Sequence, residues 1–543
     1  MELSVISRMR ILIIDNKQSA TKHLTPQLEQ IGFRNIQYVE STQRALLALE
    51  KLTFDLVICA YSIKRSHDGL YFYEKLLQSK LLPSETAFVF TSHETNFEII
   101  QSILELPADD ILAKPLKVEK LYKRISRVMR RKQKFITVHD FINEEKYNAA
   151  ITEVNKILSY QSNRDLFPLA LKMKGDLLLL AKQYEEAKAF FTSMIKIESL
   201  AWAEQGLVKS LIALGFDDDA EKQIITLAAK RETKTMAYEL LASLQIKHGA
   251  YSEALESMLI ATEISPKNMR RQHIARLIAR LTHDHETEFA VTQLLLRNSK
   301  NTVSETPEVY MKVVRAGIDF AMTADPSQVN EVMNATRQYL TELKRKFVNE
   351  DIQEDINIIK ARMSYLENDV QKATDLVENF TRDNRKLGDE SLADKAKALH
   401  EVGLKDDALA LYKVIEERAQ KRANYVDDQL SDIALFSQCI TQERFEKEQV
   451  RLNPKELNAE GITAFRNGNF AKAFDVFSQA ANIMPKNTAI ALNLLHVISK
   501  LKLSTAVEEV NTHVLHSVSL LEQKKLSFEQ AQKYKKLRNL LNV

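Results

Sequence analysis

The hydrophobic pattern of this 543-residue chain changes at about residue 133, and the change limits the folds open to it. Before that point, short apolar runs alternate with amphipathic stretches. Beyond it the apolar residues recur with helical spacing, and the short strand-like runs stop. Only 11 glycines and 10 prolines interrupt the chain, so we expect long helices joined by short turns. The sequence therefore predicts an α/β domain followed by a long all-helical region.

The first part of the chain contains five apolar runs that are typical of buried parallel strands. They are residues 11–14, 36–39, 55–59, 87–90 and 110–112, and the helical patterns beside them cover roughly 17–31, 42–51, 69–79, 95–105 and 117–132. This alternation predicts a doubly wound α/β domain with a parallel five-stranded sheet. In such sheets, ligands bind beyond the carboxyl ends of the strands, so candidate site residues belong there.

The second part of the chain repeats itself. A small residue recurs at Ala150, Ala187, Ala220 and Ala254, at spacings of 37, 33 and 34 residues. Small residues let two antiparallel helices approach closely, and a large apolar residue four positions later fills the next gap. The segments 169–199, 235–266 and 454–485 carry this pattern most fully and resemble the tetratricopeptide (TPR) repeat. Each hairpin leaves an apolar face bare, so the repeats should stack into an all-α superhelix.

Four short motifs stand, in order, at the carboxyl ends of the predicted strands. They are Ile13-Ile14-Asp15-Asn16, the segment 54–61 followed by Asp68-Gly69, Phe90-Thr91-Ser92, and the segment 107–116 with its Lys114-Pro115 pair. Together they make residues 9–132 resemble the receiver domain of bacterial response regulators, which has a flavodoxin-like fold. The resemblance implies a partner among sensor histidine kinases or other response regulators.

The resemblance also implies a chemistry and a site. Receivers accept a phosphoryl group on an aspartate at the end of strand three, with Mg²⁺ held by carboxylates and with a lysine and a hydroxyl stabilising the phosphoryl oxygens. Carried onto this sequence, the site consists of Asp15, Asn16, Ala60 at the phosphoacceptor position, Ser92 and Lys114.

Two features make this a degenerate phosphorylation site. A methyl group cannot accept a phosphoryl group, and no acidic residue lies between Leu56 and His67 to replace it. Asn16 stands where the family has a metal-binding carboxylate, so no cofactor is expected and Mg²⁺ binding should be weak or absent. The switch position, which is aromatic in many receivers, is Ile111. An alternative with no ligand remains open, in which Asp15 and Lys114 form a buried ion pair.

The resemblances divide the chain into six segments. We expect an N-terminal tail (1–8), the receiver-like domain (9–132), TPR repeats (133–300), divergent helical repeats (301–430), a linker (431–453), and a C-terminal TPR with capping helices (454–543). The repeat register predicts a protein-binding groove that is either free or occupied by the protein's own helices. Its expected lining is Lys172, Asp176, Trp202, Gln205, Lys209, Met236, Glu239, Ser243, Lys247, Asn458, Ile462 and Arg466.

Two polar clusters have simpler interpretations than a ligand site. Basic residues recur along the last predicted receiver helix, among them Lys120, Lys123 and Arg127, and could bind an acidic partner or nucleic acid. A solvated helix face at a domain junction is the favoured explanation, and no DNA-reading module follows. The run from His283 to Glu286 has the residue types of a metal site, but neighbouring side chains seldom converge on one ion. A polar turn is the expected structure there, and no metal is expected.

These observations favour a non-enzymatic signalling adaptor over an enzyme. No P-loop, GxSxG, HExxH or CxxC motif is present. The net charge of +3 gives no reason to expect nucleic-acid binding, and two cysteines exclude a disulfide framework. Without a signal-like or membrane-spanning apolar run, a cytoplasmic protein is expected. A homodimer is plausible. The alternatives are a phosphorylation-controlled response regulator and a nucleic-acid-linked regulator.

Overall fold

The computed structural model of the chain describes most of its residues. The described ranges are 6–63, 68–79, 81–94, 97–381, 383–423, 430–450, 452–501, 508–524 and 526–541. Residues 64–67, which precede the Asp68-Gly69 pair, lie outside them. The described residues form two compact units, one of residues 1–244, 257–268 and 298–306, the other of residues 245–256, 269–297 and 307–543.

The first unit begins with a parallel five-stranded sheet in the order β2-β1-β3-β4-β5. The strands are β1 (Arg10–Ile14), β2 (Asn35–Val39), β3 (Leu56–Ala60), β4 (Ala87–Ser92) and β5 (Asp110–Ala113). This is the flavodoxin-like order, with its switch point between β1 and β3. The sheet predicted from the sequence is therefore confirmed. Cβ-branched and aromatic side chains fill its central strands, which are buried on both faces.

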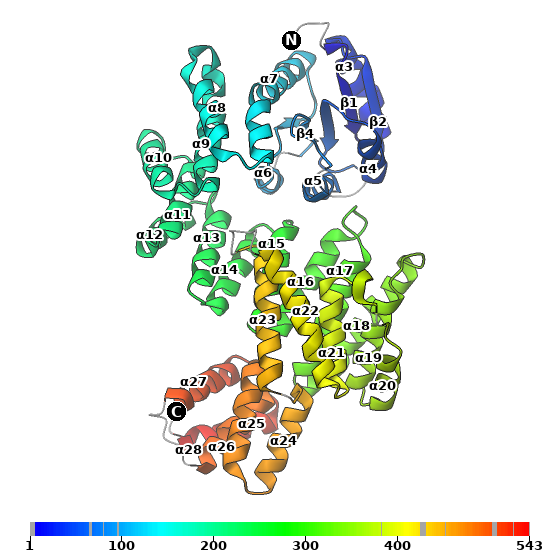
Figure 1. The fold of residues 1–543 in the computed structure, drawn as a ribbon, viewed down its shortest axis with the longest axis vertical. Coiled ribbons are helices and arrows are strands. Elements are labelled where there is room, and N and C mark those ends of the chain that lie inside the picture. Colours follow the sequence, from blue (N-terminus) through cyan, green and yellow to red (C-terminus); the bar gives the residue numbers. More distant parts are fainter. Residues whose placement is uncertain are drawn as a thin grey trace. The chain divides into compact units, whose positions relative to one another are not determined.

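Helices cover both faces of the sheet (Figure 1). On one face Leu24, Leu28 and Ile125 pack with apolar side chains of β1, β3 and β4. On the other face Leu70, Leu76 and Ile103 pack against Phe88 and Phe90 of β4. The helices of this domain are α2 (Lys17–Ser19), η1 (Ala20–Leu24), α3 (Thr25–Ile31), α4 (Thr42–Lys51), α5 (Asp68–Ser79), α6 (Phe97–Leu104) and α7 (Val118–Asn143).

Helix α7 has 26 residues and joins the sheet domain to the repeats without a break. Its first half packs Leu121 and Val128 against the sheet. Its second half packs Phe135 and Val138 against the following helix. The boundary expected at residues 132–133 thus lies inside one helix, because the apolar stripe of α7 continues along both halves.

The rest of the chain is helical within the described residues, as predicted. The helices are α8 (Tyr147–Ser159), η2 (Gln161–Leu166), α9 (Phe167–Leu180), α10 (Tyr184–Ile197), α11 (Ala201–Leu214), α12 (Asp217–Ala228), α13 (Lys234–Lys247), α14 (Tyr251–Ile264), α15 (Met269–Leu281), α16 (His285–Ser299), α17 (Pro307–Thr323), α18 (Pro326–Lys346), α19 (Gln353–Leu366), α20 (Val370–Glu378), η3 (Asn384–Lys386), α21 (Asp389–Glu401), α22 (Lys405–Ala423), α23 (Asp432–Gln449), α24 (Pro454–Arg466), α25 (Phe470–Ile483), α26 (Thr488–Leu501), α27 (Glu508–Gln523) and α28 (Phe528–Leu541).

Most of these helices pair into hairpins of the TPR type through one recurrent turn. The turn holds a residue in the left-handed conformation, where glycine costs least. Glycine stands there at 215, 249, 403 and 468, and Glu145, Lys182, His283 and Asn368 take the same conformation. The same turn also occurs within residues 270–385. For that stretch the sequence predicted helices with only a divergent repeat pattern.

One segment differs from its predicted structure. Residues 431–453 were expected to form a linker, but helix α23 occupies 432–449. Leu435, Cys439 and Ile440 of this helix are buried. Gly and Pro are absent from the helix, and its apolar residues do not gather on one side because it packs against both α15 and α22. This even distribution is why no helical stripe is visible in the sequence.

Close helix packing in the repeats depends on pairs of small and large residues. Ala150, Ala187, Ala220 and Ala254 are all fully buried, as their recurrence predicted. Four residues after Ala187, the buried ring of Phe191 lies against Gly175 and Gly206. A Cβ atom at Gly206 would come within 2.2 Å of that ring. Glycine is therefore needed on α11 because the phenyl group occupies the space of a side chain.

We predict that Gly206→Ala destabilises the repeats even though alanine favours helices. The ring is fully buried between Gly175 and Gly206 and must shift to admit the new methyl group. Overpacking of this kind costs about 1–3 kcal/mol. Phe191→Leu should remove most of the penalty, so that Gly206→Ala becomes nearly neutral in that background. Urea unfolding of the four members of this cycle measures the coupling energy. Equal effects of Gly206→Ala in both backgrounds would contradict the packing argument.

Candidate functional site

The residues predicted for the receiver-like site gather at the carboxyl edge of the sheet. Asp15 follows β1, Ala60 ends β3, Ser92 ends β4 and Lys114 follows β5. Parallel pairing puts all four strand ends at the same edge. This edge is where doubly wound folds bind ligands.

A closed group of three side chains occupies the edge between β1 and β5. Lys114 Nζ lies 2.5 Å from Asp15 Oδ2 and 2.9 Å from Ser19 Oγ. Ser19 Oγ donates to the same Asp15 Oδ2 at 2.7 Å, and the backbone N–H of Asn16 donates to Asp15 Oδ1 at 2.8 Å. Asp15 is 1% exposed. Both carboxylate oxygens of Asp15 therefore have partners within the protein. This arrangement corresponds to the alternative in which Asp15 and Lys114 form a buried ion pair. Ser19 was not predicted as part of the group.

Asn16 has a structural task at the same edge. Its side-chain Oδ1 accepts a hydrogen bond from Ser19 N at 2.8 Å and so caps helix α2. Asparagine is among the preferred N-cap residues because its oxygen satisfies a free helix N–H. The capping interaction directs this oxygen toward the helix.

The end of β3 is apolar. Ala60 is 3% exposed and pairs in register with Thr91 of β4. Thr91 is 1% exposed, and its Oγ1 has no hydrogen-bond partner among the described residues. Ser92, the hydroxyl chosen from the sequence, bonds to the backbone of Glu94 instead: its Oγ donates to the carbonyl oxygen at 2.7 Å and accepts from the N–H at 3.2 Å. The hydroxyl beside Ala60 therefore belongs to Thr91.

The Asp68-Gly69 pair holds helix α5 against the end of β3. Asp68 Oδ1 accepts from the N–H of Ile63 at 2.7 Å, and Gly69 N donates to the Tyr61 carbonyl at 3.1 Å. A Cβ atom at Gly69 would lie 2.0 Å from the Ala60 carbonyl oxygen. Asp68 and Gly69 thus hold the start of α5 close to the end of β3 by hydrogen bonding and packing.

Cys59 is the only thiol near the edge. Its burial, with Asp68 and Asp15 nearby, raises the pKa of the Cys59 thiol well above its ordinary value, although Lys114 acts in the opposite direction. A thiol that stays protonated is a poor nucleophile. Cys59 is therefore a packing residue of β3, and its thiol is not a reactive nucleophile.

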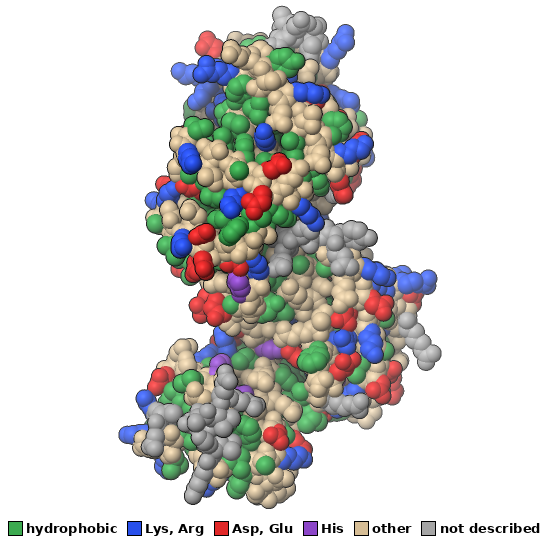
Figure 2. Space-filling model, turned by 60° about the vertical axis from the view of Figure 1, so that its left-hand side comes forward, with side chains coloured by type: hydrophobic (Ala, Val, Ile, Leu, Met, Phe, Trp, Pro, Cys, Tyr) green, Lys and Arg blue, Asp and Glu red, His purple; other side chains and the backbone are tan. Residues whose placement is uncertain are grey.

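The basic residues of α7 are partly used by the domain itself. Arg124 Nε donates to Asp110 Oδ2 at 2.6 Å, and Lys132 Nζ lies 3.2 Å from Asp109 Oδ2. Lys120, Lys123 and Arg127 are exposed. On the face drawn in Figure 2, acidic and basic side chains are interspersed. On α7 itself, the pairing of Arg124 and Lys132 with carboxylates favours a solvated helix face over a single-sign patch.

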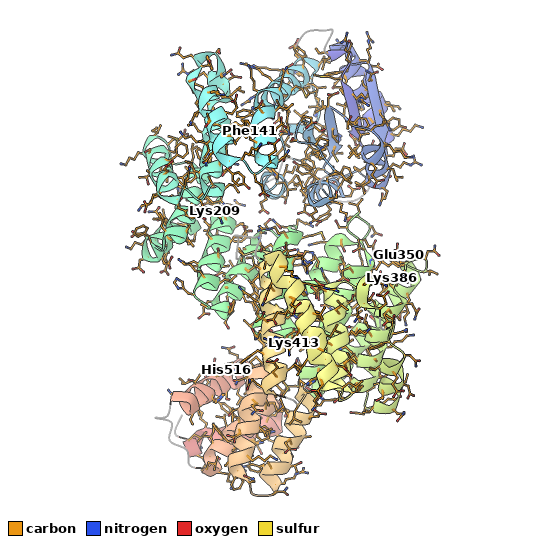
Figure 3. The ribbon with its side chains drawn as sticks, in the orientation of Figure 1. Phe141, Lys209, Glu350, Lys386, Lys413 and His516 are labelled. Carbon is orange, nitrogen blue, oxygen red and sulfur yellow. The ribbon has the colours of Figure 1, made fainter. Side chains whose placement is uncertain are left out.

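Some of the residues predicted for the groove lie near one another in the first unit. Lys172 and Asp176 on α9 approach Lys209 on α11, which Figure 3 labels. Loss of solvation raises the pKa of Asp176, although Lys172 and Lys209 act in the opposite direction. Trp202 is half-buried and makes an edge contact with Phe191, with ring centroids 6.2 Å apart. Gln205, Met236, Glu239 and Ser243 are half-buried on α11 and α13.

The remaining predicted groove residues lie in the second unit. Lys247 and Arg466 are exposed, and Asn458 and Ile462 are half-buried. Asn458 Oδ1 is buried without a hydrogen-bond partner among the described residues. These residues sit on α13 and α24 and no described contact joins them into one surface.

The largest polar cluster of the second unit was not predicted. Helices α15, α17, α19, α21 and α23 turn charged side chains toward one another, and most of these are buried. Arg362 is 2% exposed and lies 2.6–2.8 Å from Asp394, Asp319 and Glu401. The members are Arg276, Arg280, Lys312, Arg315, Asp319, Asp355, Arg362, Glu390, Asp394, Lys397, Glu401 and Glu443. We call this set the ionic core.

Among the described residues, every member of the ionic core except Lys312 has a direct ion-pair partner. Burial alone would raise the pKa of Glu443, but Arg280 and Lys397 outweigh it and lower that pKa to about 2. Arg280 Nε lies 2.6 Å from Glu443 Oε1. The sequence carried one signal of this arrangement, charged residues spaced by four on a single helix face, such as Arg276 with Arg280 and Arg315 with Asp319. Such spacing is also typical of an exposed face.

The run from His283 to Glu286 forms a helix–helix turn, as its sequence suggested. His283 has a positive φ of 52°, and Asp284 Oδ1 accepts from Thr287 N at 3.0 Å. His285, Glu288 and Asp319 bring potential ligand atoms within 4.8 Å of one another. Both Asp319 oxygens, however, are bonded to Arg362 and Lys397. Cations already occupy the position that a metal ion would need.

Comparison with known proteins identifies the first domain. The family model of the response regulator receiver domain matches residues 11–126. A probable chemotaxis protein CheY of Rhizobium etli is 23% identical over 126 residues, which are 23% of this chain and 96% of that protein. Response regulator protein GraR of Staphylococcus aureus is 24% identical over 214 residues, 39% of this chain and 83% of that protein.

The crystal structure of the APC/C hetero-tetramer Cut9-Hcn1 covers 77% of this chain and 95% of its own, at 13% identity and a TM-score of 0.28. That score is too low to carry a conclusion about the arrangement of the repeats. None of the described helices combines the length and apolar character needed to cross a membrane.

His400 on α21 gives the second unit a testable acid sensitivity. Its side chain is buried, and both ring nitrogens lack hydrogen-bond partners among the described residues. Burial, followed by Lys447 and Lys405, lowers the pKa of His400 to about 3. Below about pH 6.5, the ordinary pKa of histidine, His400 is therefore protonated in the unfolded chain but remains neutral in the folded chain. Folding stability falls as the pH falls through this window.

We predict that about 2 kcal/mol of stability is lost through His400 between pH 7 and pH 5. His400→Leu should remove this loss, which urea unfolding at the two pH values measures. The exposed His516, labelled in Figure 3, gives the control, because His516→Leu should leave the pH dependence unchanged. A His400→Leu protein that loses as much stability as the unaltered protein would contradict the burial argument.

Proposed function

Residues 11–126 form a response regulator receiver domain, and from this premise we propose that the chain is a non-enzymatic adaptor in two-component signalling. Its receiver domain docks a sensor histidine kinase or another response regulator without accepting a phosphoryl group. The helical repeats bind a second protein or peptide and so couple it to the first partner. The adaptor acts in the cytoplasm.

The observation that carries the proposal is the apolar end of β3. Phosphoryl transfer to a receiver needs an oxygen nucleophile at this edge, and Ala60 supplies a buried methyl group. Asp15 and Lys114, which in the family would face the phosphoryl group and its metal ion, satisfy each other at 2.5 Å. A docking role keeps the shape of the domain and needs none of this chemistry.

Weak or absent Mg²⁺ binding follows from the same geometry. A hard cation needs several oxygen ligands. One Asp15 oxygen accepts from the Asn16 N–H, the other from Lys114 and Ser19, and the Asn16 oxygen caps α2. A Mg²⁺ ion would have to displace the Lys114 ammonium and break the cap.

The repeat groove supports the second half of the proposal. In the first unit, Lys172, Asp176 and Lys209 present both charge signs close together, with the half-buried Trp202 on the same helix as Lys209. Charged and aromatic side chains on adjoining helices suit an extended peptide with polar groups. The receiver domain also offers helix surfaces on which a homodimer could form.

Two alternative functions remain distinguishable. A phosphorylation-controlled regulator would require an acceptor other than Ala60. A nucleic-acid-linked regulator would use Lys120, Lys123 and Arg127, but Arg124 and Lys132 on the same helix are paired with Asp110 and Asp109. Salt-dependent DNA binding that is lost on reversing the three exposed charges would support the nucleic-acid alternative.

We predict that the chain gains no adduct of about 80 Da when incubated with acetyl phosphate and Mg²⁺, because β3 ends in Ala60 and offers no carboxylate nucleophile there. Intact mass spectrometry measures this directly. The double variant Asn16→Asp with Ala60→Asp restores both carboxylates, and aspartate still caps α2. It should gain the adduct. An adduct on the unaltered receiver domain would refute the docking-only proposal.

We also predict that the chain slows phosphoryl transfer from an autophosphorylated histidine kinase of its source cell to that kinase's own response regulator. Competition for the docking surface is the reason, and the rate should fall with increasing chain concentration. Radiolabelled phosphate on the kinase and regulator measures the rate. If no histidine kinase of that cell is slowed and none binds the chain, the partner half of the proposal fails.

A further inference from the structure

A cavity of about 210 Å³ opens in the second unit beside the ionic core. Five helices contribute to its wall: α15, α17, α21, α22 and α23. The lining residues are His273, Arg276, Leu277, Lys312, Asp389, Glu390, Ala419, Arg422, Asp432, Ile433 and Phe436. The proposed signalling role uses none of them.

One wall of the cavity is apolar and has room for a ring. Leu277, Ala419, Ile433 and Phe436 supply it. A dry apolar cavity of about 150 Å³ is enough to bind benzene in another protein. The space here therefore exceeds what a six-membered ring needs and leaves volume for one polar substituent.

The inner end of the cavity holds three basic side chains from α15 and α17. Arg276 is 4% exposed, and its Nε has no hydrogen-bond partner among the described residues. Lys312 and His273 are half-buried, and within the described part of the chain neither makes a hydrogen bond or an ion pair. Buried donors without partners are costly. This end of the cavity therefore offers unused donors to a ligand.

The charges around the cavity do not cancel at its inner end. Arg422 pairs with Asp389, and Arg276 Nη2 lies 2.6 Å from Glu390 Oε1. Asp432 is exposed at the start of α23 and accepts from the Ile433 N–H at 3.0 Å, a helix position that favours a carboxylate. Lys312 and His273 are left without a counter-charge of their own.

We propose that this cavity binds a small molecule that carries one oxyanion, a carboxylate or a phosphate monoester, on an apolar ring or short chain. The oxyanion accepts hydrogen bonds from Lys312, His273 and Arg276 Nε. The apolar part lies against Leu277 and Phe436. The protein would then respond to a soluble ligand, independently of what its receiver domain binds.

The state of the basic groups without a ligand agrees with this proposal. Burial lowers the pKa of His273, and Lys312 and Arg276 lower it further. Burial also lowers the pKa of Lys312, with Arg276 adding to the effect and Glu390 opposing it. Arg276 thus disfavours the positive charge of both Lys312 and His273, and an anion placed among the three groups would relieve that repulsion. A metal ion at the same place would add to it.

Isothermal titration calorimetry on the full chain tests the proposed binding with three probes that share a benzene ring and are of similar size. Benzoate and phenyl phosphate carry the two oxyanions, and benzyl alcohol is the neutral control, each at up to about 10 mM. At least one oxyanion probe should bind while benzyl alcohol does not. The stronger of the two identifies the ligand as a carboxylate or a phosphate ester.

Two variants test the binding position. Lys312→Met keeps the length of the side chain and should weaken the oxyanion probe at least about tenfold, the worth of a charge-assisted hydrogen bond. Ile433→Trp places an indole at the mouth from a position that is 38% exposed, and should block binding without disturbing the core. Lys413→Met is the matched control because Lys413 is exposed on α22, outside the cavity (Figure 3).

Three results would overturn the proposal. They are no binding of either oxyanion probe, equal binding of benzyl alcohol, and oxyanion binding unchanged in both Lys312→Met and Ile433→Trp. Circular dichroism and thermal unfolding of each variant show whether it is folded. If Lys312→Met does not fold, the Ile433→Trp comparison decides the question alone.

Discussion

A buried charge must find a partner inside the protein, and both parts of this chain depend on that constraint. Removing one partner of a buried pair costs about 3–5 kcal/mol, because the other charge is left without solvent or counter-ion. At the edge of the sheet, Lys114 has no acidic side chain at the end of β3 and pairs with Asp15 and Ser19. In the second unit the same requirement is met by the ionic core, in which Arg362 alone contacts three carboxylates.

The two solutions have different consequences for binding. At the sheet edge both oxygens of Asp15 are satisfied, one by the N–H of Asn16 and the other by Ser19 and by Lys114 from the end of β5, so Asp15 has no oxygen left for a ligand. The ionic core fills the space between the facing helices of its repeats with the protein's own side chains. The spaces that remain between α15 and α23 have the size of small molecules. The predicted groove residues that do lie near one another are on α9 and α11, outside this core.

Local patterns predicted the parts of the fold that local physics determines. Strands such as 87–92 are buried on both faces, so an unbroken apolar run marks them. Ala187 and Phe191 mark a helix contact because their sizes must fit. Helix α23 was not predicted because it packs on two sides and so has no single apolar stripe. The continuity of α7 was not predicted because its apolar stripe runs on from the sheet domain into the repeats, and nothing in the sequence marks a boundary.

The candidate site shows the same limit at the level of single atoms. The sequence order of motifs brought Asp15 and Lys114 to one edge, because parallel strand ends must meet there. The sequence did not distinguish Thr91 from Ser92, because side chains of neighbouring strand residues point to opposite faces of the sheet and the sequence does not say which face is which. The strand register that pairs Thr91 with Ala60 depends on tertiary structure. The ionic core was not predicted from the sequence for a related reason. Charged residues spaced by four look alike on a solvated face and on a buried one, and only the packing of distant helices decides between them.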